Sequence, residues 1–335
     1  MQVVECVPNF SEGRDRSVID AIATAIGCVA DIKLLNIDAG IDANRTVYTF
    51  VGPPPAVVEA AVRAATTAVA SIDMATHHGV HPRMGALDVC PIVPLSGVTM
   101  EKCVETAHVL GRRLANELNV PIYFYGNAAT RPERRSLSAI RSGEYEGLAQ
   151  RLTDPAWVPD CGPSTFNPRA GATAVGARDI LIAYNVNLDT TDEPLAHRIA
   201  QAIRESGAKG DGREPGRLQA VRAIGWYVAE HRRAQVSVNV LNYKVTPLHK
   251  VFETVREEAE RLGLRVTGSE LVGMAPLDAL VTAGRFYYQG TDRRPGRAGD
   301  EELVDAAVQA LGLGELAPFD AGKRIIELAL QPTRR

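Results

Sequence analysis

The order of strand and helix patterns along the chain repeats, and this repeat constrains the fold more than any other feature. In the first half, apolar or β-branched runs alternate with helical periodicity. They predict strands at 2–7, 32–37, 46–51 and 87–95, and helices at 15–28 and 53–71. The order β-α-β-β-α-β is that of the ferredoxin-like plait.

The second half shows the same order without detectable identity to the first. Its patterns predict strands at 179–188, 220–228, 234–242 and 264–274, and helices at 194–205 and 247–262. A helix at 99–118, a strand at 120–125 and a proline-rich stretch at 153–171 lie between the halves. We therefore expect an α+β protein of two ferredoxin-like subdomains, 1–165 and 166–335, with the crossing in the proline-rich stretch. Two such halves form a cleft, where small ligands usually bind.

Charge and composition exclude several classes of protein. The 37 Lys and Arg against 40 Asp and Glu give a net charge of -3, which argues against nucleic acid or an anionic membrane as the main partner. We find no signal-peptide pattern at the start and no apolar run long enough to span a bilayer. Five scattered cysteines without a C-x-x-C pair suit reduced thiols. We expect a soluble, cytoplasmic protein.

A cluster of histidines is the densest group of unusual chemistry. His77, His78 and His81 fall within the segment 77–85 (HHGVHPRMG). A surface loop is one interpretation. A metal site is a second, but Gly79 and Pro82 oppose the helix that would place two histidines on one face. No Glu or Cys pair completes a zinc motif, so we expect no metal. Acid/base catalysis is the third, because histidine exchanges protons near neutrality.

Several long blocks of the sequence resemble the formiminotransferase family. They are 4–13 (VECVPNFSEG), 44–52 (NRTVYTFVG), 78–91 and 223–227 (AIGWY), and the resemblance covers nearly the whole chain. It implies transfer of a formimino group from N-formimino-L-glutamate to N5 of tetrahydrofolate, a step of histidine breakdown. In animals this domain is fused to a cyclodeaminase. Because this chain ends at Arg335, we expect the deaminase activity to be absent from it.

The resemblance also implies site residues. The catalytic histidine falls on His81, and an aspartate important for activity falls on Asp38. It implies a homodimer and tetrahydrofolate as the co-substrate. The folate-contacting segment falls on Gly162, Pro163, Ser164, Thr165, Phe166, Asn167, Pro168, Arg169, Ala170 and Gly171.

The chemistry of the residues agrees with this assignment. Formimino-glutamate has a planar amidine and two carboxylates, and Arg45, Arg83 or Arg169 could pair bidentately with the carboxylates. Asp38 has two possible roles. It could bind the amidinium, or it could support the imidazolium of His81. We favour the second, because a charge that appears only during proton transfer is one whose stabilisation lowers the barrier.

Two other functions remain open. One is transfer of formyl instead of formimino in the same site, and the other is a non-catalytic, folate-binding relative. Retention of His81 and Asp38 favours the enzyme.

Three further groups of residues have a plain structural interpretation. Cys90 lies in an apolar strand, where we expect a buried thiol and not a nucleophile. Arg131, Arg134 and Arg135 are expected to form a solvated helix start. The glycine-rich basic stretch 205–217 is a flexible loop or a lid over the glutamate tail of folate.

Overall fold

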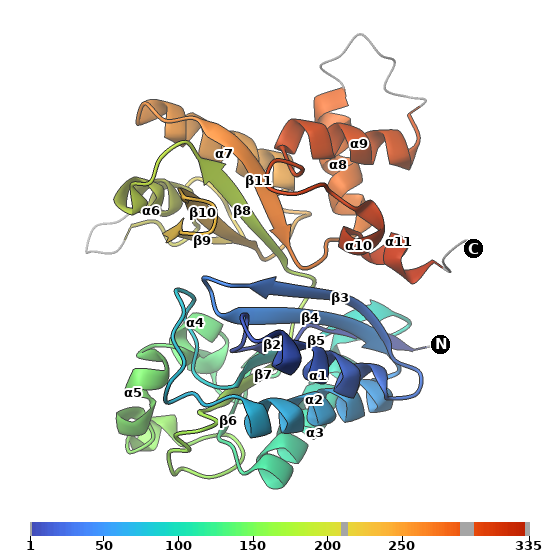
Figure 1. Cartoon of the computed structure of the whole chain (residues 1–335), viewed down its shortest axis with the longest axis vertical. Coiled ribbons are helices and arrows are strands. Elements are labelled where there is room, and N and C mark those ends of the chain that lie inside the picture. Colours follow the sequence, from blue (N-terminus) through green and yellow to red (C-terminus); the bar gives the residue numbers. More distant parts are fainter. Residues whose placement is uncertain (1, 209–213, 289–297, 332–335) are drawn as a thin grey trace. The chain divides into compact units, whose positions relative to one another are not determined.

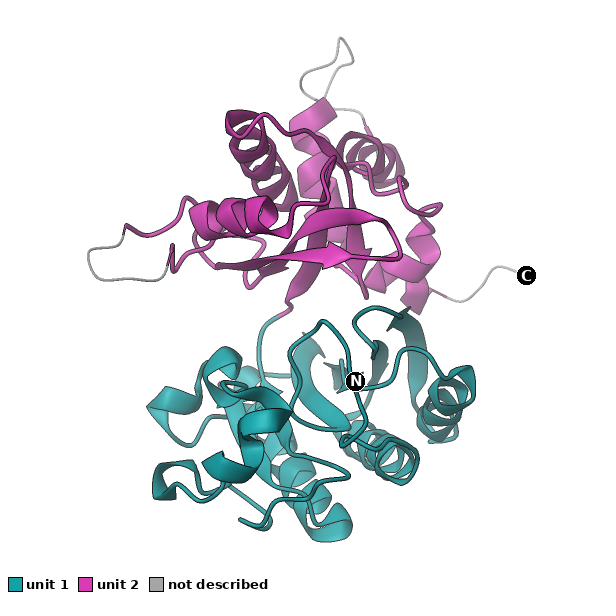
Figure 2. Ribbon diagram, turned by 60° about the vertical axis from the view of Figure 1, so that its left-hand side comes forward, with its two compact units in different colours: residues 1–179 teal, residues 180–335 magenta. Residues whose placement is uncertain are grey.

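The computed structural model describes residues 2–208, 214–288 and 298–331. The chain forms two compact units, Met1–Asp179 and Ile180–Arg335 (Figure 2). The division falls later in the chain than the boundary after 165 expected from the sequence, because the proline-rich stretch packs within the first unit. The basic stretch considered as a lid lies partly outside the described residues, since 209–213 are not among them.

The first unit is built on one mixed sheet (Figure 1). In the described part of this unit the sheet has seven strands, in the order β1-β4-β2-β5-β7-β6 with β3 beside β4. The strands are β1 (Val3–Cys6), β2 (Asn9–Phe10), β3 (Lys33–Gly40), β4 (Arg45–Gly52), β5 (Leu87–Ser96), β6 (Ile122–Gly126) and β7 (Thr173–Ala177). Strands β5, β7 and β6 pair in parallel, and the other pairs are antiparallel.

Three helices cover one face of this sheet (Figure 1). They are α1 (Arg16–Gly27), α2 (Pro54–Ser71) and α3 (Met100–Leu118). Helix α1 begins where the Asp15 carboxylate accepts from the backbone N–H of Ser17 at 2.8 Å, which satisfies a free donor of the first turn. Its residues at spacings of three and four, Ile19, Ile22 and Ile26, are fully or almost fully buried against the sheet.

The other face of the sheet is covered at its β5, β6 and β7 end. Two short helices, α4 (Leu137–Ile140) and α5 (Glu144–Arg151), contribute Ile140 and Leu148 to a second core with Tyr123 and Tyr125 of β6. Two single-turn helices, η1 (Pro132–Arg134) and η2 (Pro155–Trp157), flank this layer. The residues of the candidate site lie on this face.

A β-bulge interrupts strand β5 where it meets β2. Asn9 pairs with Val89 and Phe10 pairs with Leu87, so Asp88 is the extra residue between the two pairs. In a regular strand Asp88 would point to the side opposite Val89. The bulge turns its side chain instead toward the face of Asn9, where it meets Arg45.

The second unit has an antiparallel sheet in the order β11-β8-β10-β9. Its elements are β8 (Ile182–Leu188), α6 (Glu193–Ile203), β9 (Val221–Val228), β10 (Arg233–Val240), α7 (Leu248–Arg261) and β11 (Val266–Val272). Among the described residues after β11 the chain forms α8 (Leu277–Tyr288), α9 (Asp300–Leu311), α10 (Ala321–Arg324) and α11 (Ile326–Leu330). Alternate residues of β8 and β10, such as Tyr184 and Val236, are buried in one core with α6 and α7.

The structure is α+β, and both units contain the predicted succession of strands and helices. The sequence patterns did not predict β2, β7, α4 and α5, or the described helices after β11. Within the described residues no helix is both long and apolar enough to cross a bilayer.

Candidate active site

The histidine cluster forms a loop between α2 and β5, as one of the three sequence interpretations predicted. Residues 77–80 lie against the turn at 42–44. His77 Nε2 donates to the carbonyl of Asn44 at 2.8 Å, and Val80 N donates to the carbonyl of Asp42 at 3.1 Å. A Cβ at position 79 would lie 2.2 Å from the carbonyl oxygen of Ala43, so only glycine fits there. The loop is therefore held by close backbone contacts.

Arg83 attaches the same loop to helix α5. Its guanidinium makes a bidentate pair with Glu146, at 2.6 Å (Nη2–Oε1) and 2.8 Å (Nη1–Oε2). Its Nε donates to Nδ1 of His77 at 3.3 Å. Arg83 is buried, and ion pairing with Glu146 raises its pKa. Arg83 was one of the arginines expected to bind the substrate carboxylates, but in the structure its guanidinium is paired with Glu146.

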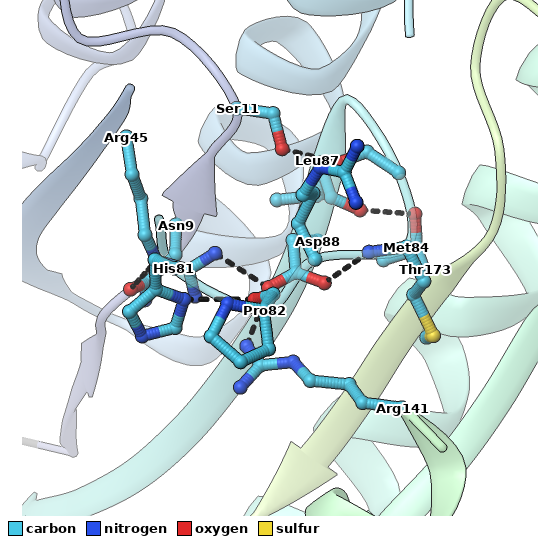
Figure 3. Close-up of polar contacts among 12 residues, drawn as sticks. Asn9, Ser11, Arg45, His81, Pro82, Met84, Leu87, Asp88, Arg141 and Thr173 are labelled. Atoms are coloured by element: carbon cyan, nitrogen blue, oxygen red, sulfur yellow. Dashed lines mark hydrogen bonds and ion pairs between the residues drawn. The ribbon is translucent and has the colours of Figure 1, made fainter. Parts of the chain in front are cut away.

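His81 lies in the same loop and is half-buried, and Figure 3 shows it beside Arg45 and Asp88. Its Nδ1 lies 2.7 Å from the carbonyl oxygen of Pro82. Since a carbonyl only accepts, Nδ1 holds the proton, and Nε2 is the basic nitrogen of the neutral ring. Burial, and then the positive charges of Arg45 and Arg141, lower the pKa of His81 well below its ordinary value of 6.5, against an opposing effect of Asp88. At neutral pH the ring is therefore an uncharged base.

Asp88 connects two arginines beside His81 (Figure 3). Its Oδ2 accepts from Nη1 of Arg45 at 2.5 Å and from Nη2 of Arg141, while its Oδ1 accepts from the backbone N–H of Met84 at 3.0 Å. The carboxylate has no exposed surface. Burial alone would raise its pKa, but Arg141 and Arg45 outweigh burial and lower it to about 2. Asp88 is therefore an ionised carboxylate in the protein interior.

Arg45 is positioned by β4 and by a second contact on the sheet face. Its Nε donates to Oδ1 of Asn9 at 3.1 Å, so Asn9 and Asp88 together fix the guanidinium. Burial, the largest effect, lowers the pKa of Arg45 to about 10, which leaves it charged at neutral pH.

The predicted folate segment lies directly against the histidine loop. Gly85 and Gly171 form a β-bridge, Ala86 N donates to the carbonyl of Ala170 at 2.9 Å, and Ala172 N donates to that of Met84 at 2.9 Å. Gly171 has a φ of +68°, and a Cβ there would lie 2.1 Å from the Met84 oxygen. The structure thus brings the two predicted parts of the site together within one unit.

The rest of this segment is folded by local contacts. Asn167 Oδ1 accepts from the backbone N–H of Arg169 at 3.2 Å and from that of Ala170 at 3.0 Å. The half-buried ring of Phe166 packs on Tyr145, with centroids 5.5 Å apart. Arg169 donates to the carbonyls of Val69 and Ala70 at the end of α2. Its guanidinium is therefore used to hold the segment on the helix. The remaining residues of the segment are partly or fully exposed, among them Pro163, Ser164, Thr165 and Pro168.

Asp38 lies on the same sheet face as Asn9. It pairs across β3 and β4 with Val47, and Val47 pairs across β4 and β2 with Asn9, so the three side chains form one cross-strand row. Arg45 lies two residues before Val47 on the same face. The sheet therefore presents the predicted aspartate toward the side that holds Arg45 and Asp88.

A cavity of about 410 Å³ opens beside the loop, lined by His78, Gly79, Arg83, Gly143, Glu144 and Glu146. Its rim is more acidic than basic, since two carboxylates face one ion-paired arginine. Among the described residues, no three His, Cys, Asp or Glu side chains gather as a metal ion would require.

Cys90 and Arg134, both expected to have structural roles, differ in outcome. Cys90 is fully buried, with its Sγ 3.5 Å from that of Cys6, so the predicted core thiol is confirmed. Arg134 was expected in a solvated helix start, and this prediction is wrong. Its side chain is completely buried, and its Nη1 lies 2.8 Å from Oδ2 of Asp160.

Asp88 and Arg141 were not among the site residues expected from the sequence. A signal existed for the first, because Asp88 is the one charged residue in an otherwise apolar strand, and buried carboxylates are rare unless they are paired. Arg141 follows a four-residue helix that has no clear periodicity, so no sequence pattern marked it.

Sequence comparison decides the family. The N-terminal subdomain of the formiminotransferase domain matches residues 3–178, and the formiminotransferase domain itself matches residues 183–331. The chain belongs to the formiminotransferase family. The resemblance stated from the sequence blocks is therefore confirmed.

Two kinds of relative are similar to this formiminotransferase-family chain. It is 55% identical over 326 residues to the formimidoyltransferase-cyclodeaminase of Mus musculus, covering 97% of this chain and 59% of the mouse protein. The chain thus spans 59% of that relative's length. It is 43% identical to the glutamate formimidoyltransferase of Thermoplasma acidophilum, covering 92% and 99% of the two chains. The Streptococcus pyogenes protein of the same name is 42% identical, with 87% and 95% covered.

Proposed function

We propose that this protein is a glutamate formimidoyltransferase that transfers the formimino group of N-formimino-L-glutamate to N5 of tetrahydrofolate. The relatives that match over nearly their whole length are named for this activity. The observation that carries the proposal is the state of His81. It is a neutral imidazole with the proton on Nδ1 and a basic Nε2, and the loop that carries it is hydrogen-bonded through Met84 and Ala86 to the end of the predicted folate segment.

His81 acts as the general acid and base in this proposal. N5 of the folate attacks the amidine carbon, and the resulting N5 ammonium gives its proton to Nε2 of His81. The imidazolium then returns that proton to the glutamate nitrogen as the carbon–nitrogen bond to glutamate breaks. The products are 5-formimino-tetrahydrofolate and glutamate.

The low pKa of His81 suits both steps. The N5 proton is acidic once N5 has attacked, so a weak base removes it. An imidazolium of low pKa is a strong acid, which favours protonation of the leaving nitrogen. Proton transfer of this kind contributes about 10²–10⁴-fold, and holding two substrates together contributes much of the remainder.

Asp38 and residues 162–171 complete the proposed site. Asp38 supports the imidazolium of His81, in line with its place on the sheet face of Asn9 and Arg45. The segment Gly162–Gly171 binds tetrahydrofolate, with Phe166 offering an apolar ring face. The bonds between this segment and the histidine loop support that assignment.

We further propose a homodimer of cytoplasmic location, in which each unit is a variation of the ferredoxin-like plait. The strand order β11-β8-β10-β9 supports the plait in the second unit. Light scattering of the purified protein tests the dimer. The reaction needs no metal in this proposal, so dialysis against a strong chelator is expected to leave the rate unchanged.

One assay tests the function. Purified protein is mixed with tetrahydrofolate and either N-formimino- or N-formyl-L-glutamate, and the folate product is followed by absorbance. We expect turnover with the formimino donor. Turnover with the formyl donor alone would replace the proposed substrate, and folate binding without turnover of either donor would indicate a non-catalytic relative.

A further inference from the structure

Asp88 makes three contacts to three different parts of the first unit (Figure 3). Its carboxylate accepts from Arg45 on β4, from Arg141 after α4, and from the backbone of Met84 at the end of the histidine loop. Both carboxylate oxygens are used. The β-bulge that turns Asp88 toward these partners is therefore the feature that joins the sheet, the loop and the α4 region.

The charge of this cluster also matters for His81. Two guanidinium groups face one carboxylate, so the cluster has one excess positive charge. Arg45 and Arg141 both act against a charged His81, and Asp88 acts in favour of it. On β3, Asp38 is a further carboxylate on the same sheet face. The balance among these groups determines how easily His81 accepts a proton.

A purely structural role explains Asp88 poorly. Burying a carboxylate and two arginines has a large desolvation cost, and a well-packed apolar cluster is often as stable. The neighbouring residues of β5 are apolar and buried, so an apolar residue would suit the strand itself. Buried ionised groups next to a histidine of shifted pKa are typical of functional sites.

We propose that Asp88 is a positioning residue for His81: it fixes the histidine loop through Met84 and offsets the charges of Arg45 and Arg141 beside the imidazole. This inference rests on the proposed function, because it assigns His81 the proton transfer. In this proposal Asp88 touches no reacting atom and acts only through the position of the loop and the charge around the imidazole of His81.

The test measures protonation of His81 directly, by NMR titration of the imidazole in the folded protein without substrates. The variants are Arg141→Gln and the double variant Asp88→Asn with Arg141→Gln. Arg141→Gln leaves Asp88 and Arg45 as a balanced pair, so the titration midpoint of His81 should rise by about 1 pH unit, as expected for one nearby charge. Adding Asp88→Asn leaves Arg45 unopposed, so the midpoint should fall again by a similar amount.

Arg113→Gln is the matched control. Arg113 makes ion pairs with Glu59 and Glu117 on the helical side of the sheet, so the substitution removes the same charge away from His81. The titration midpoint of His81 in Arg113→Gln should equal that in the unmodified protein. Circular dichroism at each pH verifies that every variant is folded. Midpoints equal in all four proteins would overturn the proposal, and so would a double variant whose midpoint is not lower than that of Arg141→Gln.

The pH dependence of kcat/KM links this result to catalysis. If His81 transfers the proton, the acid limb should shift in the same directions as the NMR midpoints. The His81 midpoint could rise in Arg141→Gln and fall again in the double variant while the unmodified protein turns over neither donor. That result would support the role of Asp88 and refute the proposed function. Turnover of the formimino donor with no change of the His81 midpoint in either variant would support the function and refute the role of Asp88.

Discussion

Arg45 donates from Nη1 to Oδ2 of Asp88 at 2.5 Å, and the two side chains are 7% and 0% exposed. A buried ion pair seldom adds net stability, but removing one partner leaves an uncompensated charge in the interior. The sequence places these residues 43 positions apart, and the β-bulge at Asp88 brings them together. This contact is the centre of the polar network around His81.

Asp88→Asn is expected to destabilise the protein by about 3–5 kcal/mol, because Arg45 and Arg141 lose their counter-charge. Urea unfolding at neutral pH measures this. Arg113→Gln, which breaks partly exposed ion pairs, should cost less than about 1 kcal/mol. Equal losses in the two variants would contradict the role given to the buried pair.

The same pair predicts a pH dependence of stability. The pKa of Asp88 is lowered from 3.8 to about 2 in the folded protein. Its contribution, about 2 kcal/mol, is complete above the unfolded pKa and is lost as pH falls from about 4 to about 2. The free energy of unfolding, measured by urea through this interval, should fall more steeply in the unmodified protein than in Asp88→Asn. Parallel curves would show that Asp88 does not titrate as described.

His77 and His78 are expected to differ from His81 and from each other. His77 is buried with hydrogen bonds to Asn44 and Arg83, so His77→Ala should lower the free energy of unfolding by about 1–3 kcal/mol. His78 is exposed, and His78→Ala should leave stability unchanged. Neither substitution should remove proton transfer. Equal loss of activity in the three alanine variants would indicate a metal site or a purely structural loop.

Asp38→Asn separates the two roles considered for that residue. If Asp38 supports the imidazolium of His81, kcat and kcat/KM should fall together, because the interaction exists mainly in the transition state. The pKa in the pH–rate profile should also fall, since a neighbouring negative charge has been removed. An increase in KM for the donor alone would show that Asp38 binds the amidinium instead. If Asp38→Asn lowers thermal stability but leaves the kinetics unchanged, the role of Asp38 is structural.

Gly171→Ala tests the attachment of the predicted folate segment to the histidine loop. The left-handed backbone alone costs about 1–2 kcal/mol for alanine, and the contact with the Met84 oxygen adds to it. Gly147 of α5 has open space around it, so Gly147→Ala should stabilise by about 0.5–1 kcal/mol. Thermal unfolding compares the two. A harmless Gly171→Ala would mean that the two segments are not held together as described.

Periodicity predicted the elements that have strong local signals. The α1, α2 and α3 helices and strands β1, β3, β4 and β5 all appear close to their predicted bounds. Strand β7 was missed because its small residues, Thr173–Ala177, show no alternation and are buried on both sides between β5 and β6. The predicted ligand cleft between the halves stays a prediction.

The candidate site was predictable only in part. The histidine cluster was visible in the sequence itself, the resemblance singled out His81 and the segment 162–171, and the structure shows the loop and this segment bonded to each other. Asp88 could not be assigned, because its direction depends on a bulge that only the pairing of β2 with β5 creates. Arg45, Arg83 and Arg169 were offered as substrate ligands because their internal partners lie far away in the sequence.

The rate of formimino transfer by His81→Ala tests the central claim most directly. With saturating tetrahydrofolate and N-formimino-L-glutamate, kcat should fall by about 10²–10⁴-fold relative to the unmodified protein, because the proton relay is lost. The dissociation constant for tetrahydrofolate, measured in parallel, should be unchanged. A kcat within a few-fold of the unmodified value would contradict the assignment of proton transfer to His81.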